Sequence, residues 1–343
     1  MNLASMKKKT DFHELTLVSM LIVLSLVVFI INPAYLSLSN VYKVLKSSVE
    51  MGLFAIAFLL ILILGGMDMS FPAIASASMY MTIKVLIPIK ADLPLIVPFL
   101  IAMGFGLIMG CINGFFIGIL GLPTLIVTLG TMSVIKGFLL VFVGKNWITQ
   151  LPNVLIRFSK ANLFTAVSNS GETIGLHVSV LILATVAIAA VFFLKYTWFG
   201  RSIYAIGSNP IAAERDGVNC RKVKFIVCVV SAILSSVAGL VHCSLVRVAN
   251  PFDILGTELN TIAAVVIGGA SLVGGYGTVG GTLLGVLLVN LINNSLILMG
   301  IPSYWHKFVV GAIIIISTMV TANKDVLKKV GFFKKDFTKE VEA

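Results

Sequence analysis

Residues 198–224 read WFGRSIYAIGSNPIAAERDGVNCRKVK, and this polar, positively charged stretch lies between two long apolar runs. Most of the remaining chain is hydrophobic. A simple turn between membrane spans needs few residues, so a charged, amphipathic connector of this length indicates a surface for a soluble partner. We therefore expect the chain to be the membrane-embedded half of an assembly whose other half is a separate polypeptide.

The composition places most of the chain in lipid. Of its 343 residues, 58% are hydrophobic and only 11% are charged, which is more apolar surface than a water-soluble fold can bury. The first apolar run follows Lys7, Lys8 and Lys9 and is not trailed by a small-residue cleavage site. It is expected to be a retained membrane helix and not a signal peptide that is removed.

Apolar runs of about twenty residues, the length that crosses a bilayer, recur along the chain. The sequence predicts an all-α, polytopic membrane protein of about ten transmembrane helices, some broken by Gly or Pro, with a short cytoplasmic helix. These helices form a transmembrane domain over 15–322, between an N-terminal segment at 1–14 and a tail at 323–343. The predicted spans are 15–31, 46–65, 71–88, 93–119, 123–143, 174–194, 223–246, 259–275, 280–299 and 304–322.

The formal net charge of +11 is concentrated at the N-terminus, in the 195–224 region and in the tail after residue 323. With an even number of spans these three places lie on one side of the membrane, and the positive-inside rule makes that side the cytoplasm. Both termini are therefore expected to be cytoplasmic. Because the basic residues follow the membrane topology, a nucleic-acid partner is not expected.

The motifs of metal, cofactor and enzyme chemistry are missing from the sequence. The four cysteines and four histidines lack the close spacing of metal ligands. Residues 274–281 are rich in glycine but do not end in the Gly-Lys-Ser/Thr that binds a nucleotide phosphate. If ATP drives the function of this chain, hydrolysis must therefore take place on another subunit.

Asp68 is the one acidic residue that we place within the apolar layer, where an acid at the centre of a helix costs about 2.5–3.5 kcal/mol. One role that would retain it is a hydrogen-bonding group close to a transport pathway. The other is to cap a helix that starts around Ser70, with Pro72 in its first turn. The two roles are compatible.

Uncharged polar side chains recur on otherwise apolar spans, and each needs a hydrogen-bond partner in lipid. The threonines between 124 and 131 share one helix face, as do the asparagines between 290 and 294. Such groups suit a neutral, hydroxyl-rich solute, although hydrogen bonds between helices explain the same residues. The candidate pathway residues are Asp68, Asn113, Thr124, Thr128, Thr131, Asn260, Asn290 and Asn294.

Within the 198–224 stretch, Asn209 and Pro210 form a helix-start signal, with Asn209 as the cap and Pro210 in the first position. A short helix is predicted from Pro210 to Asp216, ending at Gly217. A helix of under two turns is unstable alone, so it needs a surface on which to dock; an ordinary charged loop is the alternative. The residues expected to contact a partner are Asn209, Pro210, Ala212, Ala213, Glu214, Arg215, Asp216 and Gly217.

Three connections, 65–70, 121–123 and 274–281, carry almost no charge and many glycines. Irregular backbone at membrane depth is tolerated only where protein buries it or water reaches it. We therefore expect these breaks beneath the helices, close to the pathway. The longest external connection, 144–173, is expected on the outer surface, either as a contact for an extracytoplasmic partner or as a passive loop.

Four motifs, in matching order, resemble those of the bacterial ABC-type simple-sugar permeases, the ribose-type family. GGMDMS at 65–70 resembles the family's Gly-Gly-Ile-Asp-Leu-Ser motif, and GLPTLIVTLGT at 121–131 is similar to its fifth-helix signature. FGR, YAIGSN, AA and GV between 199 and 218 resemble its coupling segment, and IAAVVIGGASL at 262–272 resembles a further signature. Phe71-Pro72 departs from the usual Val-Gly, which puts the local helix geometry in doubt.

The resemblance implies a permease subunit of an ATP-driven importer in the bacterial cytoplasmic (inner) membrane. Its partners would be two cytoplasmic ATPase subunits, an extracytoplasmic sugar-binding protein, and a second permease that is either a copy or a paralogue. The short helix around 210–217 would occupy a groove on the ATPase. The solute would be a small neutral sugar, such as ribose or another pentose, a hexose, or the furanosyl signal autoinducer-2.

Two other kinds of transporter fit parts of the sequence. An ion-coupled secondary sugar transporter would use Asp68 as a proton or sodium site, but it predicts charged pairs in other spans. A passive channel would need no docking helix. For the ion-coupled transporter, the one base expected within the apolar spans, Lys136, lies on a different helix from Asp68.

Overall fold

The computed structural model describes residues 3–89, 93–144, 146–167, 173–300, 302, 305, 308 and 311–312, and helices dominate these residues, as the sequence predicts. The long helices are α1 (Leu3–Ile31), α2 (Leu38–Ile63), α3 (Phe71–Leu86), α4 (Ile96–Gly114), α5 (Thr124–Phe138), α7 (Ser179–Tyr196), α10 (Cys220–Val246), α11 (Glu258–Ile267) and α12 (Val279–Leu298). The shorter elements are η1 (Pro33–Leu36), η2 (Phe115–Ile119), η3 (Leu139–Val143), α6 (Asn153–Lys160), β1 (Asn162–Val167), β2 (Thr173–His177), α8 (Trp198–Ser208) and α9 (Pro210–Arg215).

Among the described residues, seven helices are long and apolar enough to cross a bilayer, and α3 and α11 are shorter apolar helices. Each of the first nine predicted spans therefore contains an apolar helix. The tenth, 304–322, and the tail at 323–343 fall almost entirely outside the described residues. The chain is thus a multi-pass membrane protein.

Helix α2 begins at Leu38, before the predicted 46, and two other predicted spans extend beyond their helices. The span predicted at 259–275 is helical only to Ile267, because the backbone turns at Gly269, Gly274 and Gly275, which all have positive φ. The span predicted from 174 begins as a helix only at Ser179, since the residues before it form strand β2. Both errors fall where apolar residues continue beyond a helix end.

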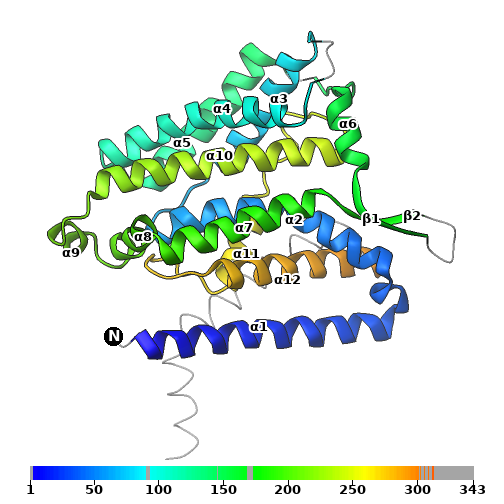
Figure 1. Ribbon diagram of the computed structural model, residues 1–343, viewed down its shortest axis with the longest axis horizontal. Coiled ribbons are helices and arrows are strands. Elements are labelled where there is room, and N and C mark those ends of the chain that lie inside the picture. The colour runs from blue at the N-terminus through cyan, green and yellow to red at the C-terminus, as the bar shows by residue number, and fades with distance from the viewer. Residues whose placement is uncertain are drawn as a thin grey trace, which may run out of the picture.

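Helices α2 and α10 form the centre of the bundle. In the most apolar 18-residue stretch of each helix, 78% of the residues of α2 and 61% of those of α10 are buried within the chain. The corresponding shares are only 11% for α1 and 17% for α5. Figure 1 shows α1 and α5 at opposite margins of the bundle, with α2, α7 and α10 between them. The apolar faces of α1 and α5 are therefore available to lipid or to another subunit.

A stripe of glycines joins α4 to α10. Gly106, Gly110, Gly114 and Gly118 recur at every fourth position and face α10. A methyl group at Gly110 would lie 2.8 Å from the Cα atom of Val229, and one at Gly118 would lie 2.7 Å from the backbone nitrogen of Phe225. Small residues at this spacing let two membrane helices approach closely.

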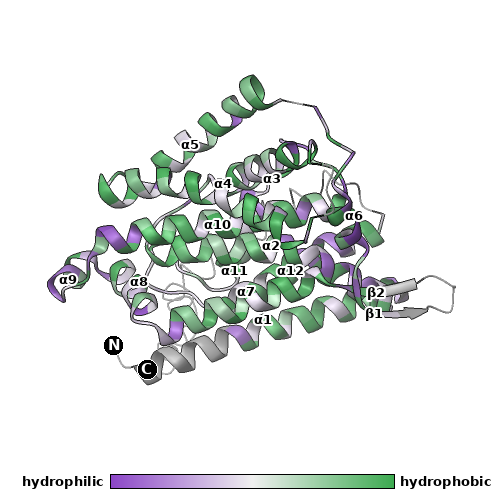
Figure 2. Cartoon of the chain, turned by 45° about the horizontal axis from the view of Figure 1, so that its top comes forward, coloured by the Kyte–Doolittle hydropathy of each residue, from purple (hydrophilic) through white to green (hydrophobic). Residues whose placement is uncertain are grey.

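The two ends of the bundle differ in structure. The start of α1 lies at the same end as α8 and α9, and the β1–β2 hairpin lies at the opposite end (Figure 1). The predicted external connection at 144–173 contains α6 and β1, and β1 pairs antiparallel with β2, with Asn162 opposite His177. Figure 2 shows mainly hydrophobic residues along the long helices and hydrophilic residues at α9.

Candidate functional site: the coupling segment and the polar chain beside it

The coupling segment, residues 198–224, begins with two short helices capped by side chains. The Thr197 hydroxyl accepts a hydrogen bond from the backbone nitrogen of Gly200 at 3.0 Å, which starts α8. Asn209 Oδ1 accepts one from the backbone nitrogen of Ala212 at 3.1 Å, and Pro210 opens α9. The predicted helix start is confirmed. The helix ends at Arg215, one residue earlier than predicted, with Asp216 as its cap.

Helix α9 projects from the bundle and exposes most of its surface. Among its residues only Ala213 is buried, while the side chain of Ile211 is 65% exposed. Glu214, Arg215 and Asp216 are exposed beside it. An apolar side chain held outward on a short helix and surrounded by charges is a typical contact for a protein partner.

In contrast to α9, α8 is attached firmly to the bundle. Ile203 and Ile206 are buried, and the Tyr204 hydroxyl donates a hydrogen bond to the carbonyl of Gly277 at 2.7 Å. Burial and the neighbouring Tyr276 raise the pKa of Tyr204 to about 12. The phenol therefore keeps its proton near neutral pH and remains a donor.

Three backbone segments meet beneath α8. The amide of Gly275 donates a hydrogen bond to the carbonyl of Ile63, the last residue of α2, at 2.8 Å. Gly207 lies against both residues: a methyl group there would overlap the Ile63 carbonyl and lie 2.6 Å from the Gly275 nitrogen. We call this contact of Ile63, Gly207 and Gly275 the glycine joint. Two of the predicted glycine breaks, 65–70 and 274–281, thus come together here.

A chain of hydrogen bonds leads away from the loop that follows α2. Asp68 is 3% exposed, and its Oδ1 atom accepts hydrogen bonds from both the backbone nitrogen and the hydroxyl of Ser70 at 2.6 Å. The Asn113 amide donates to the Ser70 hydroxyl at 2.9 Å, and the Thr131 hydroxyl donates to Asn113 Oδ1 at 2.7 Å. We call Asp68, Ser70, Asn113 and Thr131 the polar chain. Of these donors, the backbone nitrogen and the hydroxyl of Ser70 bond directly to the Asp68 carboxylate.

The other two threonines of α5 contact the same loop. The Thr128 hydroxyl accepts a hydrogen bond from the backbone nitrogen of Met69 at 3.1 Å. The Thr124 hydroxyl packs against Gly66, where an added methyl group would lie 2.9 Å from it. The structure therefore brings together Asp68, Asn113, Thr124, Thr128 and Thr131, which the sequence offered only as separate candidates. Asp68 also accepts a hydrogen bond from the backbone nitrogen of Ser70, the residue that precedes α3, whereas its role beside a pathway stays a prediction.

The remaining candidates lie elsewhere. The amide of Asn290 donates to the Ser48 hydroxyl at 3.0 Å, and that of Asn294 donates to Asn40 Oδ1 at 2.8 Å, so both join α12 to α2. Asn260 is half-buried on α11. The contacts of Asn290 and Asn294 are those of hydrogen bonds between helices, the alternative that the sequence left open.

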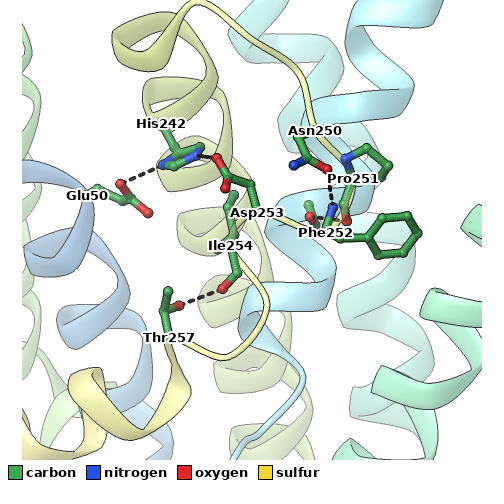
Figure 3. A network of polar contacts seen from close by, with 9 residues as sticks. Glu50, His242, Asn250, Pro251, Phe252, Asp253, Ile254 and Thr257 are labelled. Carbon is green, nitrogen blue, oxygen red and sulfur yellow. Dashed lines mark hydrogen bonds and ion pairs between the residues drawn. The ribbon is translucent and has the colours of Figure 1, made fainter. Parts of the chain in front are cut away.

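A charged network at the hairpin end of the bundle was not predicted. The Nδ1 atom of His242 lies 2.7 Å from Glu50 Oε2, and its Nε2 atom lies 3.0 Å from Asp253 Oδ2 (Figure 3). These residues come from α10, α2 and the loop after α10. The sequence gave no signal for them, because Glu50 and His242 are 192 residues apart.

Comparison with known proteins identifies the class. The chain belongs to the family described as branched-chain amino acid transport system / permease component, whose family model matches residues 40–318. It is therefore a permease component of a transport system. No solved structure matches the chain.

Three curated relatives match along most of their length. The ribose import permease protein RbsC of Haemophilus influenzae is 31% identical, with 87% of this chain and 90% of the relative covered. The probable ABC transporter permease protein YphD of Escherichia coli K12 is 32% identical, with 92% of each covered. The autoinducer 2 import system permease protein LsrC of Photorhabdus luminescens is 32% identical, with 88% of each covered.

Proposed function

We propose that this chain is the transmembrane permease subunit of an ATP-binding-cassette importer for a small neutral sugar. The observation that carries the proposal is the exposed helix α9, with Ile211 outward, on a chain whose relatives include ribose and autoinducer-2 import permeases. Hydrolysis of ATP would take place on separate subunits that grip this helix. Asn209, Pro210, Ala212, Ala213, Glu214, Arg215, Asp216 and Gly217 form the proposed coupling site.

The orientation in the membrane follows from the charges. The coupling segment carries Arg201, Arg215, Arg221, Lys222 and Lys224, and the positive-inside rule favours the cytoplasm for this end. The start of α1 lies at the same end (Figure 1). We propose that both termini are cytoplasmic and that the hairpin end faces the outside, where an extracytoplasmic binding protein delivers the sugar.

The proposed pathway runs beside the polar chain. Its groups are neutral apart from Asp68, whose carboxylate already accepts two hydrogen bonds from Ser70. Thr131, at the far end of the polar chain, is half-buried on the weakly packed helix α5. A second permease, either a copy or a paralogue, would cover α5 and close the pathway between the two subunits.

The ion-coupled alternative is not supported. It predicts charged pairs in other spans, and Glu50 of α2 does contact His242 of α10. Among the described residues, however, the side-chain hydrogen bonds of Asp68 are to Ser70 and not to this pair. The relatives are named as import permeases and one as an ABC transporter permease. We propose only the class of sugar that is carried: a pentose, a hexose or an autoinducer-2-like furanose.

The test is the coupling of hydrolysis to uptake in the complex of permease, ATPase subunits and binding protein. Glu214→Arg reverses one charge on α9 and is expected to lower ATPase binding or sugar-stimulated hydrolysis about tenfold while the chain remains in the membrane. Lys43→Glu, a charge reversal at an exposed position of α2, is the matched control. Unchanged sugar-stimulated hydrolysis in Glu214→Arg would count against the proposal.

A further inference from the structure

We propose that the glycine joint transmits movement of the coupling segment to the Gly65–Ser70 loop, and through it to the polar chain and α5. This inference rests on the proposed function, because it names the route by which ATPase-driven movement would reach the pathway. Gly207 and Tyr204 act in it as positioning residues.

The first step is the contact of α8 with α2. Gly207 has no side chain between its backbone and the Ile63 carbonyl, and an added methyl group would overlap that oxygen. The Gly275 amide is bonded to the same carbonyl at 2.8 Å. Backbone atoms in direct contact have no rotamers through which to absorb a displacement. Movement of α8 must therefore displace the end of α2, the 274–277 loop, or both.

The second step leads from the 274–277 loop to the loop after α2. A methyl group at Gly274 would lie 2.6 Å from the Cα atom and 2.7 Å from the nitrogen of Gly65. Gly275 packs in the same way on Ser208, whose Cα would lie 2.9 Å from the added carbon. The coupling segment and the Gly65–Ser70 loop thus lie on two sides of the same pair of glycines.

The third step leads from the Gly65–Ser70 loop into the membrane helices. Gly66 packs on the Thr124 hydroxyl, and Met69 donates its backbone N–H to Thr128 at 3.1 Å. Ser70 receives the Asn113 amide of α4 at 2.9 Å. A shift of this short loop therefore changes hydrogen bonds to α4 and α5 together.

The hydrogen bond of Tyr204 secures the joint from its other side. The phenol reaches the Gly277 carbonyl at 2.7 Å, so α8 is tied to the 274–277 loop at two points. Tyr204→Phe removes this bond and leaves the ring in place. It is the mild variant for the test, and Gly207→Ala is the strong one.

The experiment measures sugar molecules taken up per ATP hydrolysed by the complex reconstituted in vesicles. Gly207→Ala is expected to lower this ratio about tenfold and Tyr204→Phe about threefold, with hydrolysis itself retained. Gly104→Ala is the control, because an added methyl group there meets no atom within 4 Å. A ratio equal to wild type in Tyr204→Phe, or a parallel loss of hydrolysis and uptake in assembled complexes, would overturn the proposal.

If the complex with Gly207→Ala does not assemble, a double mutant that combines Tyr204→Phe with Thr128→Val tests the proposal. Thr128→Val removes the acceptor for Met69 but lies on a different element from Tyr204. Transmission predicts that the effects of Tyr204→Phe and Thr128→Val on the ratio are not additive, whereas additive effects would contradict it. The wild-type complex separates this test from that of the proposed function. If wild type shows no ATP-driven uptake, the proposed function is wrong. If wild type shows such uptake, the variants test only the role of the glycine joint.

Discussion

Helix α2 is held in different ways at its last residue and near its middle. At the coupling end, Ile63 is held by backbone atoms of Gly207 and Gly275, without charge. Toward the hairpin end, Glu50 is held by the side chain of His242, which also reaches Asp253 (Figure 3). The two positions are about 20 Å apart along the helix. The difference indicates a rigid backbone contact at the last residue of α2 and a charge-dependent side-chain contact near its middle.

The chemistry of each contact explains this contrast. A backbone joint between glycines depends on the absence of side chains, so any Cβ disrupts it while salt leaves it unchanged. A network of His and carboxylates depends on charge and is partly open to solvent, since the Asp253 side chain is 44% exposed. Salt screens such contacts. Variants at the glycine joint and variants in the network of His242 should therefore change stability by different amounts, and only the latter changes should depend on salt.

The largest effect is expected from Gly275→Ala. Its φ of +72° is strained for any side chain, and the added carbon meets Ser208. Gly256→Ala, with φ of +92° and no neighbour within 4 Å, carries the same strain without the overlap. Thermal unfolding in detergent should show Gly275→Ala less stable than Gly256→Ala by about 1–3 kcal/mol. Equal stability of the two variants would mean that the joint is not tightly packed.

Removal of the Asp68 carboxylate is expected to rank second. Asp68→Ala leaves the buried N–H and hydroxyl of Ser70 without their acceptor, at a cost of about 1–3 kcal/mol in stability. Asp68→Asn keeps one acceptor oxygen and should cost less. Asp253→Ala, at the exposed end of the charged network, should cost below about 1 kcal/mol. A loss for Asp253→Ala as large as that for Asp68→Ala would contradict the expected difference between the exposed charged contact and the buried one.

A smaller effect is expected within the charged network itself. A double-mutant cycle of Glu50→Gln and His242→Gln should give a coupling of about 1 kcal/mol that declines as salt is raised. The cause is the contact of 2.7 Å between partly buried groups. The matched cycle of Ser48→Ala and Asn290→Ala tests an uncharged contact between α2 and α12. A salt-independent coupling between Glu50 and His242 would refute the electrostatic account.

The smallest effect is expected at His177 in strand β2, as a change in the way that stability depends on pH. Burial, followed by the charge of Lys46, lowers the pKa of His177 below its usual 6.5. The folded state therefore binds fewer protons than the unfolded state as the pH falls below 6.5, so stability is lost on the acid side. His177→Asn should flatten this loss when melting temperatures at acidic and neutral pH are compared with wild type. An unchanged acid dependence would show that His177 does not cause it.

The sequence predicted the features that depend on neighbours in the chain. Apolar runs marked the membrane helices, and Asn209-Pro210 marked the start of α9. It could not predict which surfaces meet. The glycines from 106 to 118 face α10 and the amide of Asn294 reaches Asn40 only because the helices pack as they do. The strand pairing before α7 was missed because an apolar run alone does not separate a strand from a helix.

The same limit applies to the site. The motif at 65–70 and the threonines of α5 were recognised separately, but the contact of Met69 with Thr128 is a property of the fold. The glycine joint likewise needs residues near 63, 207 and 275 to meet. Nothing in their local sequence states this, since a glycine break looks the same whether it packs on another backbone or faces solvent.

In the proposed function, this chain moves sugar only when a separate ATPase drives it through the coupling segment. The direct measurement is sugar accumulation in sealed vesicles that hold the chain with or without its ATPase subunits, with the binding protein and ATP supplied. Accumulation against the gradient is expected only in the complete system. Accumulation by the chain alone, or uptake that survives ATP depletion and collapses with an ionophore, would contradict it.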